Sequence, residues 1–176
     1  MAYEGTILTG CGEIHTDFTD TYVVVVSGDT PCGHALIFDR KGGYYFHAMG
    51  DPEGSGAGKL CGYPLYMNVA GYARYLAENG KHEVGRRDID LPNPKGAQDY
   101  IENRLTSTWC WRGLPHNCVA FVESVVAAGG GSWGSYSNCP TAAISDSLSL
   151  SEQIERISYW LETGVYDLYK EPHYGH

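Results

Sequence analysis

A cysteine at the expected start of a helix is the residue with the clearest potential for chemistry. Cys118 follows Asn117, whose side-chain oxygen can accept a free N–H group of a first helical turn. The positive end of a helix dipole favours a thiolate over a thiol, so this position predicts a lowered pKa for Cys118. Such a thiol suits nucleophilic catalysis, whereas a small buried apolar side chain is the alternative interpretation.

Two histidines lie on strands that are predicted earlier in the chain. His34 begins a strand over residues 34–39 (HALIFD), and His47 lies in a strand over 44–49 (YYFHAM). An imidazole is the usual base for a catalytic thiol, because its pKa lies near neutral pH. A single histidine on a strand is more often structural, so the interpretation depends on whether these two residues meet.

The hairpin between these strands decides whether the histidines meet. If residues 41–42 form a two-residue loop, His34 opposes Met49 and Leu36 opposes His47. All four residues then share one face, which makes the two histidines diagonal neighbours. A three-residue turn would flip one strand and separate them.

Catalysis by a thiol needs a base beside the thiol and a third group that orients the base. Cys118 is the candidate nucleophile, His34 the candidate base and His47 the candidate orienting group. Backbone N–H groups at the start of the helix can hold an oxyanion. The sequence leaves three alternatives for the orienting group: Asp20, Asp39 and His116.

Composition narrows the possible partners. The chain has 176 residues and 43% hydrophobic residues, which predicts one domain with a proper core. Its net charge of −9 argues against nucleic acid or an anionic membrane as the main partner. It has no apolar run long enough to span a membrane, and its first residues are too polar for a signal peptide. We expect no cofactor.

Six cysteines without a CxxC pair argue against a zinc ribbon. In an oxidising compartment, one or two disulfides could form among the five cysteines other than Cys118. A zinc cluster remains an alternative if the loops that carry the candidate ligands meet. The candidate ligand pairs are Cys32 with His34, His116 with Cys118, and Cys11 with His15.

The periodicity of apolar residues predicts an α+β fold. Strands are expected over 6–8, 22–27, 34–39, 44–49 and 82–91, and helices over 95–106, 118–128 and 149–162. Residues 69–79 fit either a helix or strand segments. We expect a single domain over 1–176, with a core over about 20–128 and a helical C-terminal extension over 149–176.

Three short motifs carry a resemblance to a known family. The motifs CGHALIF around His34, YYFHAM around His47 and NCVAFV around Cys118 resemble the circularly permuted NlpC/P60 (papain-like) superfamily, which includes lecithin:retinol acyltransferase-like proteins. In the permuted members the histidine strands precede the cysteine helix, as they do here. The resemblance implies an antiparallel sheet or half-barrel packed against that helix, with Cys118, His34 and His47 as the catalytic residues.

The resemblance also implies a substrate. NlpC/P60-like enzymes typically cut amide bonds in the stem peptides of bacterial peptidoglycan. The acyltransferase branch usually carries a hydrophobic membrane anchor, which this sequence lacks, so the peptidase branch is favoured. The residues expected to line the substrate cleft or the oxyanion site are Trp109, Trp111, His116 and Asn117. The helix over 95–106 and the tryptophan pair are not features of the family.

A small acidic amidase without a signal peptide resembles the antibacterial effectors of type VI secretion. Such a protein would act as a monomer in the periplasm of a target cell, on peptidoglycan, and would be neutralised by an immunity protein. Otherwise it would stay in the cytoplasm. One alternative is an acyltransferase, thioesterase or lipase that uses the same cysteine and histidine. A second is a non-catalytic or zinc-binding module.

Overall fold

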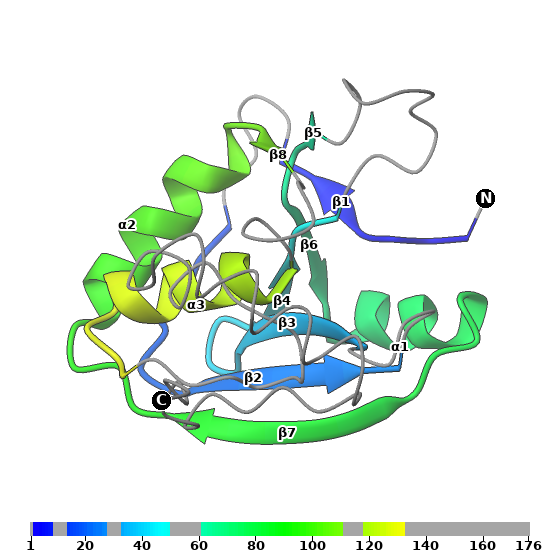
Figure 1. Cartoon of the computed structure of the whole chain (residues 1–176), viewed down its shortest axis with the longest axis horizontal. Coiled ribbons are helices and arrows are strands. Elements are labelled where there is room, and N and C mark those ends of the chain that lie inside the picture. Colours follow the sequence, from blue (N-terminus) through cyan, green and yellow to red (C-terminus); the bar gives the residue numbers. More distant parts are fainter. Residues whose placement is uncertain (1, 9–13, 28–32, 50–60, 111–117, 133–176) are drawn as a thin grey trace, which may run out of the picture.

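The computed structural model describes residues 2–8, 14–27, 33–49, 61–110 and 118–132. These residues form two antiparallel sheets and three helices, which confirms the predicted α+β class (Figure 1). In chain order the elements are β1 (Thr6–Ile7), β2 (Thr21–Val26), β3 (His34–Asp39), β4 (Tyr44–His47), β5 (Cys61–Gly62), β6 (Leu65–Asn68), α1 (Val69–Glu78), β7 (Glu83–Ile89), α2 (Pro94–Leu105), β8 (Trp109–Cys110) and α3 (Cys118–Ala128).

The larger sheet has six strands in the order β1-β6-β4-β3-β2-β7, and each neighbouring pair is antiparallel. Strand β2 has the sequence TYVVVV and lies between β3 and β7, as expected for a run of β-branched residues. Strand β7 forms one edge, and its side chains are exposed up to Asp88. A short second sheet pairs β5 with β8.

The register between β3 and β4 is the predicted one. Ile37 pairs with Phe46, and Asp39 pairs with Tyr44. The turn between the strands differs from the prediction, because residues 40–43 rather than a two-residue loop connect the paired ends. The Gly43 N–H closes this turn by donating to the Asp39 carbonyl at 2.8 Å. The longer turn leaves the register unchanged, so the faces of both strands are as expected.

The ladder between β3 and β4 stops early. Its last pair is Ile37 with Phe46, so the predicted pairs of His34 with Met49 and of Leu36 with His47 do not form. Strand β4 ends at His47, two residues before the predicted end. The two strands are therefore no longer paired at the end of the hairpin that carries both histidines.

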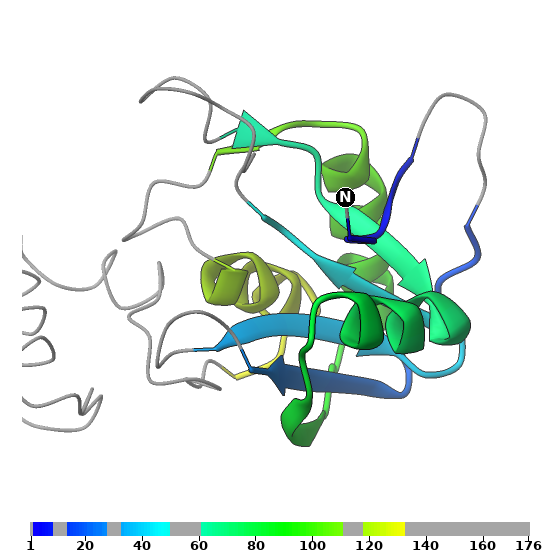
Figure 2. The same ribbon diagram turned by 90° about the vertical axis from the view of Figure 1, so that its right-hand side faces the viewer.

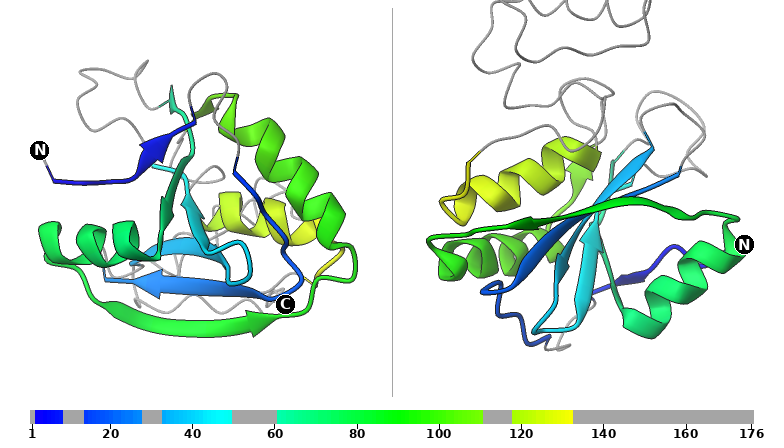
Figure 3. Two further views of the ribbon diagram at one scale, coloured as in Figure 1. Left: turned by 180° about the vertical axis from the view of Figure 1, so that it is seen from behind. Right: turned by 90° about the horizontal axis from the view of Figure 1, so that it is seen from below.

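Helices cover both faces of the sheet. Figures 2 and 3 show α1 on the opposite side of the sheet from α2 and α3. On the α2–α3 face, Ile37 and Phe46 join the core together with Ile101 and Phe121. The second core lies on the α1 face, and its main members are Val24, Leu36, Phe38, Tyr45, Met67, Tyr72 and Tyr75. The alternation of side chains along β3 therefore divides its residues between two cores.

Helix α3 is buried on almost all sides. Its predicted apolar stripe is confirmed, since the stripe residues Cys118, Phe121, Val122, Val125 and Val126 are all buried. Val119, Ala120 and Glu123 are buried as well, which places α3 inside the fold rather than on its surface. A helix held this firmly can fix the position of the thiol at its first residue.

The two other helices follow local capping signals. Residues 69–79, which fit either a helix or strands, form helix α1, and the Asn68 side chain accepts the Gly71 N–H at its start. Helix α2 begins at Pro94 and is capped by Asn93, close to the predicted range. The predicted helix over 149–162 lies outside the described residues. None of the helices in the described ranges is long and apolar enough to cross a membrane.

Candidate active site

The site begins where the β3–β4 ladder stops, beyond the pair of Ile37 with Phe46. The Arg40 N–H points toward β2, because it donates to the Asp20 carbonyl at 2.9 Å. Backbone groups alternate in direction along an antiparallel strand, so the Ala35 N–H points toward β4. Strand β4 pairs with β3 only from Ile37 onward. The Ala35 N–H therefore faces a position that β4 has left open to another acceptor.

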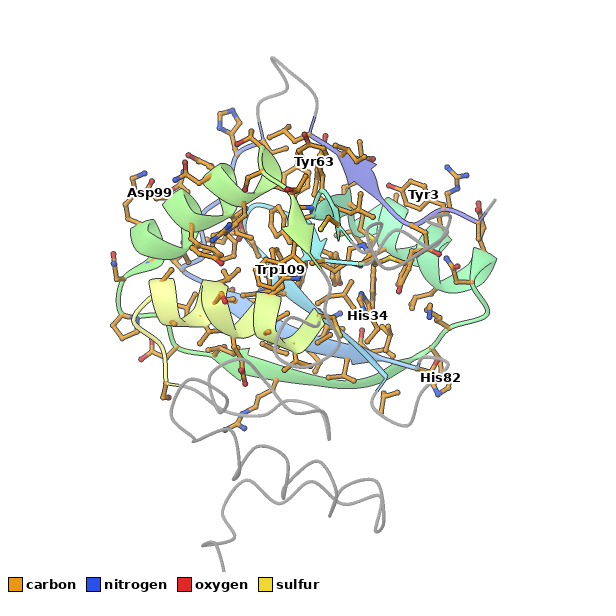
Figure 4. The ribbon with its side chains drawn as sticks, turned by 45° about the horizontal axis from the view of Figure 1, so that its top comes forward. Tyr3, His34, Tyr63, His82, Asp99 and Trp109 are labelled. Atoms are coloured by element: carbon orange, nitrogen blue, oxygen red, sulfur yellow. The ribbon has the colours of Figure 1, made fainter. Side chains whose placement is uncertain are left out.

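The sulfur of Cys118 takes that position. Cys118 is a free cysteine at the first residue of α3, and its sulfur accepts the Ala35 N–H. The N–H groups of Val119 and of Cys118 itself also approach the sulfur. Figure 4 shows His34, the residue before Ala35, at the end of β3 that faces the start of α3. The thiol thus lies beside the backbone of the strand residue that follows the first histidine.

Burial decides the protonation of the Cys118 thiol. The residue is only 8% exposed. Burial raises the pKa of the thiol above its ordinary value, although the three backbone N–H groups oppose this rise. The direction is opposite to the predicted lowering, because the loss of solvent around a thiolate outweighs the favourable end of the helix. Cys118 is therefore a neutral thiol in the resting protein.

The two histidines are in direct contact. The Nε2 atom of His34 lies 2.8 Å from the Nδ1 atom of His47, and their rings are nearly perpendicular, with an interplanar angle of 80°. This confirms the prediction that they are neighbours. His47 is fully buried and packs against the Tyr75 ring of α1. Its Nε2–H donates to the main-chain carbonyl of Glu4 at 2.7 Å.

Both imidazoles favour the neutral form. Burial lowers the pKa of His34 well below its usual value, and the nearby His47 and Lys81 lower it further. The pKa of His47 falls to about 4, mainly through burial, although the hydrogen bond to Glu4 opposes this shift. A neutral imidazole is a base that has not yet taken a proton.

Two alternatives for the orienting group are engaged elsewhere. Asp39, at the opposite end of β3 from His34, accepts the N–H groups of Asp17 and Gly42. Asp20 forms an ion pair with Arg40. The third alternative, His116, lies outside the described residues. Of the candidates that the structure describes, His47 is the one that contacts His34.

The predicted substrate-binding residues fall mostly outside the described part of the chain. This applies to Trp111, His116 and Asn117. Trp109 is described (Figure 4), and it is a core residue that is only 5% exposed. Its ring meets that of Phe121 edge to face, with 5.5 Å between the ring centroids. Its predicted part in substrate binding stays a prediction.

Sequence reasoning missed two groups that act on the histidines. The Glu4 carbonyl and the Lys81 ammonium act on His47 from segments without a recognisable motif. A main-chain carbonyl has no signal in the residue types, and Lys81 lies in the ordinary turn that follows the end of α1 at Glu78. Cys61 forms a disulfide bond. The sequence allows such a bond among the five cysteines other than Cys118.

Within the described ranges, no three histidine, cysteine, aspartate or glutamate side chains gather as metal ligands would. Cys11, Cys32 and His116 of the zinc hypothesis lie outside those ranges. Comparison of the chain with models of protein families, with curated proteins and with solved structures gives no match. The chemistry of Cys118, His34 and His47 is therefore inferred from their geometry.

Proposed function

We propose that the protein is a cysteine hydrolase that cleaves amide bonds in the stem peptides of bacterial peptidoglycan. One observation carries the proposal: the Cys118 sulfur accepts the N–H of Ala35, and the adjacent His34 is hydrogen-bonded to His47. A thiol, a base and an orienting group are the minimum set for acyl transfer. Two histidine strands that precede a cysteine helix also fit a permuted papain-like arrangement.

The first half of the reaction forms an acyl-enzyme. His34 takes the proton of the Cys118 thiol as the sulfur attacks the carbonyl carbon of the scissile amide. The carbonyl oxygen becomes an oxyanion, which the backbone N–H groups of Cys118 and Val119 at the start of α3 would stabilise. His34 then returns the proton to the amide nitrogen, so the C–N bond breaks and a free amine leaves.

The second half releases the acid. Water attacks the thioester carbon while His34 takes one of its protons. The tetrahedral intermediate expels the Cys118 sulfur, which takes the proton back from His34. The products are a carboxylic acid and the original thiol, so all atoms and charges balance. His47 holds the His34 ring through both steps and is not itself consumed.

The setting is also a proposal. A disulfide at Cys61 fits a protein that ends in an oxidising compartment such as the bacterial periplasm, where peptidoglycan lies. The net charge of −9 makes nucleic acid an unsuitable ligand. Both features agree with an exported antibacterial toxin of the type VI effector kind, for which a producing cell needs an immunity protein.

The test is digestion of purified peptidoglycan followed by mass analysis of the soluble fragments. The native protein should release fragments that are hydrolysed at one amide bond of the stem peptide, and Cys118→Ala should release none. Ser124→Ala is a matched control, because Ser124 lies on the same helix and donates only to the Ala120 carbonyl. It should keep the native rate.

Two outcomes would overturn the proposal. Full activity in Cys118→Ala would exclude the thiol mechanism. Release of fatty acid from phospholipid by the native protein, with peptidoglycan left intact, would move the same residues to an acyltransferase or lipase reaction. Circular dichroism of each variant shows whether a loss of activity reflects a loss of fold.

A further inference from the structure

The N-terminal segment lies directly beside the second histidine. Strand β1 pairs with β6, with Thr6 opposite Tyr66 and Ile7 opposite Leu65. Strand β6 also pairs with β4, where Leu65 is the partner of His47. The residues before β1 therefore run past His47, and the carbonyl of Glu4 accepts its Nε2–H at 2.7 Å.

The other end of this segment is anchored on α1. The Tyr3 N–H donates to the Glu78 carboxylate at 2.8 Å, and the Asn79 side-chain amide donates to the Tyr3 carbonyl at 2.9 Å. The Arg74 guanidinium also lies over the Tyr3 ring, 4.5 Å from its centre. Figure 4 shows Tyr3 at the end of the molecule where α1 lies. The Glu4 carbonyl is thus held from both sides.

Gly5 allows the carbonyl to point at the imidazole. Its φ angle of +124° is one that residues with a side chain rarely adopt. A Cβ atom at Gly5 would lie 3.0 Å from the Cβ of Leu65 and 3.5 Å from the Nε2 of His47. Any side chain here would therefore strain the backbone and push on the contact between Glu4 and His47.

The contact determines where the protons of both imidazoles lie. A carbonyl oxygen only accepts hydrogen bonds, so the Nε2 atom of His47 carries a proton. In a neutral ring its Nδ1 atom is then an acceptor, and the Nε2 atom of His34 must donate to it. The remaining nitrogen of His34, Nδ1, is left with a free lone pair.

We propose that the Glu4 carbonyl is a positioning group that sets the tautomers of His47 and His34 and so makes the Nδ1 atom of His34 the base for Cys118. The use of that base in hydrolysis rests on the function proposed above, while the tautomers do not. The N-terminal segment, 114 residues before the thiol, is then part of the site through a main-chain atom.

The carbonyl can be weakened without changing any side chain. A synthetic peptide thioester of residues 1–10 can be ligated to Cys11 of the remaining chain, because the junction is Gly10–Cys11. Glycolic acid in place of Gly5 turns the Glu4 carbonyl into an ester carbonyl, which is a weaker acceptor. The same protein ligated with Gly5 is the control. Histidine ¹⁵N chemical shifts report the tautomers in both proteins.

In the control protein, both His34 and His47 should be protonated at Nε2 and not at Nδ1. The ester should shift both rings toward a mixture of tautomers and lower kcat roughly tenfold with little change in KM, as expected for the loss of one hydrogen bond. Gly5→Ala should lower kcat in the same way. Gly43→Ala, at another positive-φ glycine with open space around it, should not.

Protonation of His47 at Nδ1 in the control protein would overturn the inference, even in an active enzyme. Unchanged tautomers and kcat in the ester protein would also overturn it. If the expected tautomers are found but the control protein leaves peptidoglycan intact, the proposed function fails and the role of the Glu4 carbonyl stands.

Discussion

At the scale of single residues, the site combines a thiol and an imidazole that are both neutral at rest. Burial disfavours the thiolate of Cys118 and the imidazolium of His34. A preformed ion pair of these two groups would need the opposite shifts. In the proposed mechanism the proton would move to His34 only when the substrate carbonyl is attacked, and the hydrogen-bonded His47 would keep the ring in place for that transfer.

Alkylation of Cys118 by iodoacetamide tests this resting state. Because burial raises the pKa of the thiol, the rate should keep rising with pH beyond pH 9 and should show no plateau between pH 5 and 8. Mass spectrometry of the peptide that contains Cys118 follows this one residue. A rate that is high and constant across pH 5–8 would instead indicate a thiolate–imidazolium pair.

The pH dependence of stability tests the buried His47. In the unfolded chain its pKa is about 6.5, but in the folded protein it is about 4. Between these values the unfolded state binds more protons, so the free energy of unfolding should fall as the pH is lowered from about 6.5 to about 4. Urea titrations should show a smaller slope in His47→Asn. Equal slopes would contradict a neutral, buried His47.

The sequence suffices for some of these residues and not for others. His34 and His47 could be placed together because a hairpin register follows from apolar alternation and turn residues. The Glu4 carbonyl could not be found, because the contact joins main chain to side chain across 43 positions. The direction of the Cys118 pKa shift was predicted wrongly, because the depth of burial depends on how several elements pack around one atom.

At the scale of elements, the thiol lies where the β3–β4 ladder stops sooner than the sequence predicts. The predicted register is correct, but it implied pairing up to Met49. The ladder in fact ends at Ile37 and Phe46, where the Ala35 N–H turns to the sulfur of α3. Where two strands stop pairing depends on the helix that competes for their backbone groups. The hairpin sequence contains no information about that helix.

Helix α3 must be packed firmly for this arrangement to hold. Phe121 is fully buried and meets the Trp109 ring. Phe121→Ala should lower the free energy of unfolding by about 3–5 kcal/mol, because a large cavity opens in the core. Ser124→Ala on the same helix should change it by less than about 0.5 kcal/mol. Urea midpoints measure both, and a loss below about 1 kcal/mol in Phe121→Ala would contradict the packing of α3.

At the scale of the whole molecule, a disulfide at Cys61 adds to the stability of the fold. A bridge of this kind typically contributes about 2–4 kcal/mol, mainly by restricting the unfolded chain. Reduction should therefore lower the melting temperature by roughly 5–15 °C for a chain of this size. Thermal unfolding with and without a reductant measures the change. An identical melting temperature under both conditions would show that the bridge is not part of the native protein.

The central claim is that Cys118 and His34 act as one catalytic unit, and a double-mutant cycle on kcat/KM for a soluble stem-peptide substrate tests it most directly. Residues of one unit are strongly non-additive, because removal of either already abolishes the shared step. Cys118→Ala and His34→Gln should each lower kcat/KM by at least roughly 1,000-fold, and the double variant should be no slower than either. Losses that multiply in the double variant, or a Cys118→Ala protein that still hydrolyses the substrate, would contradict the claim.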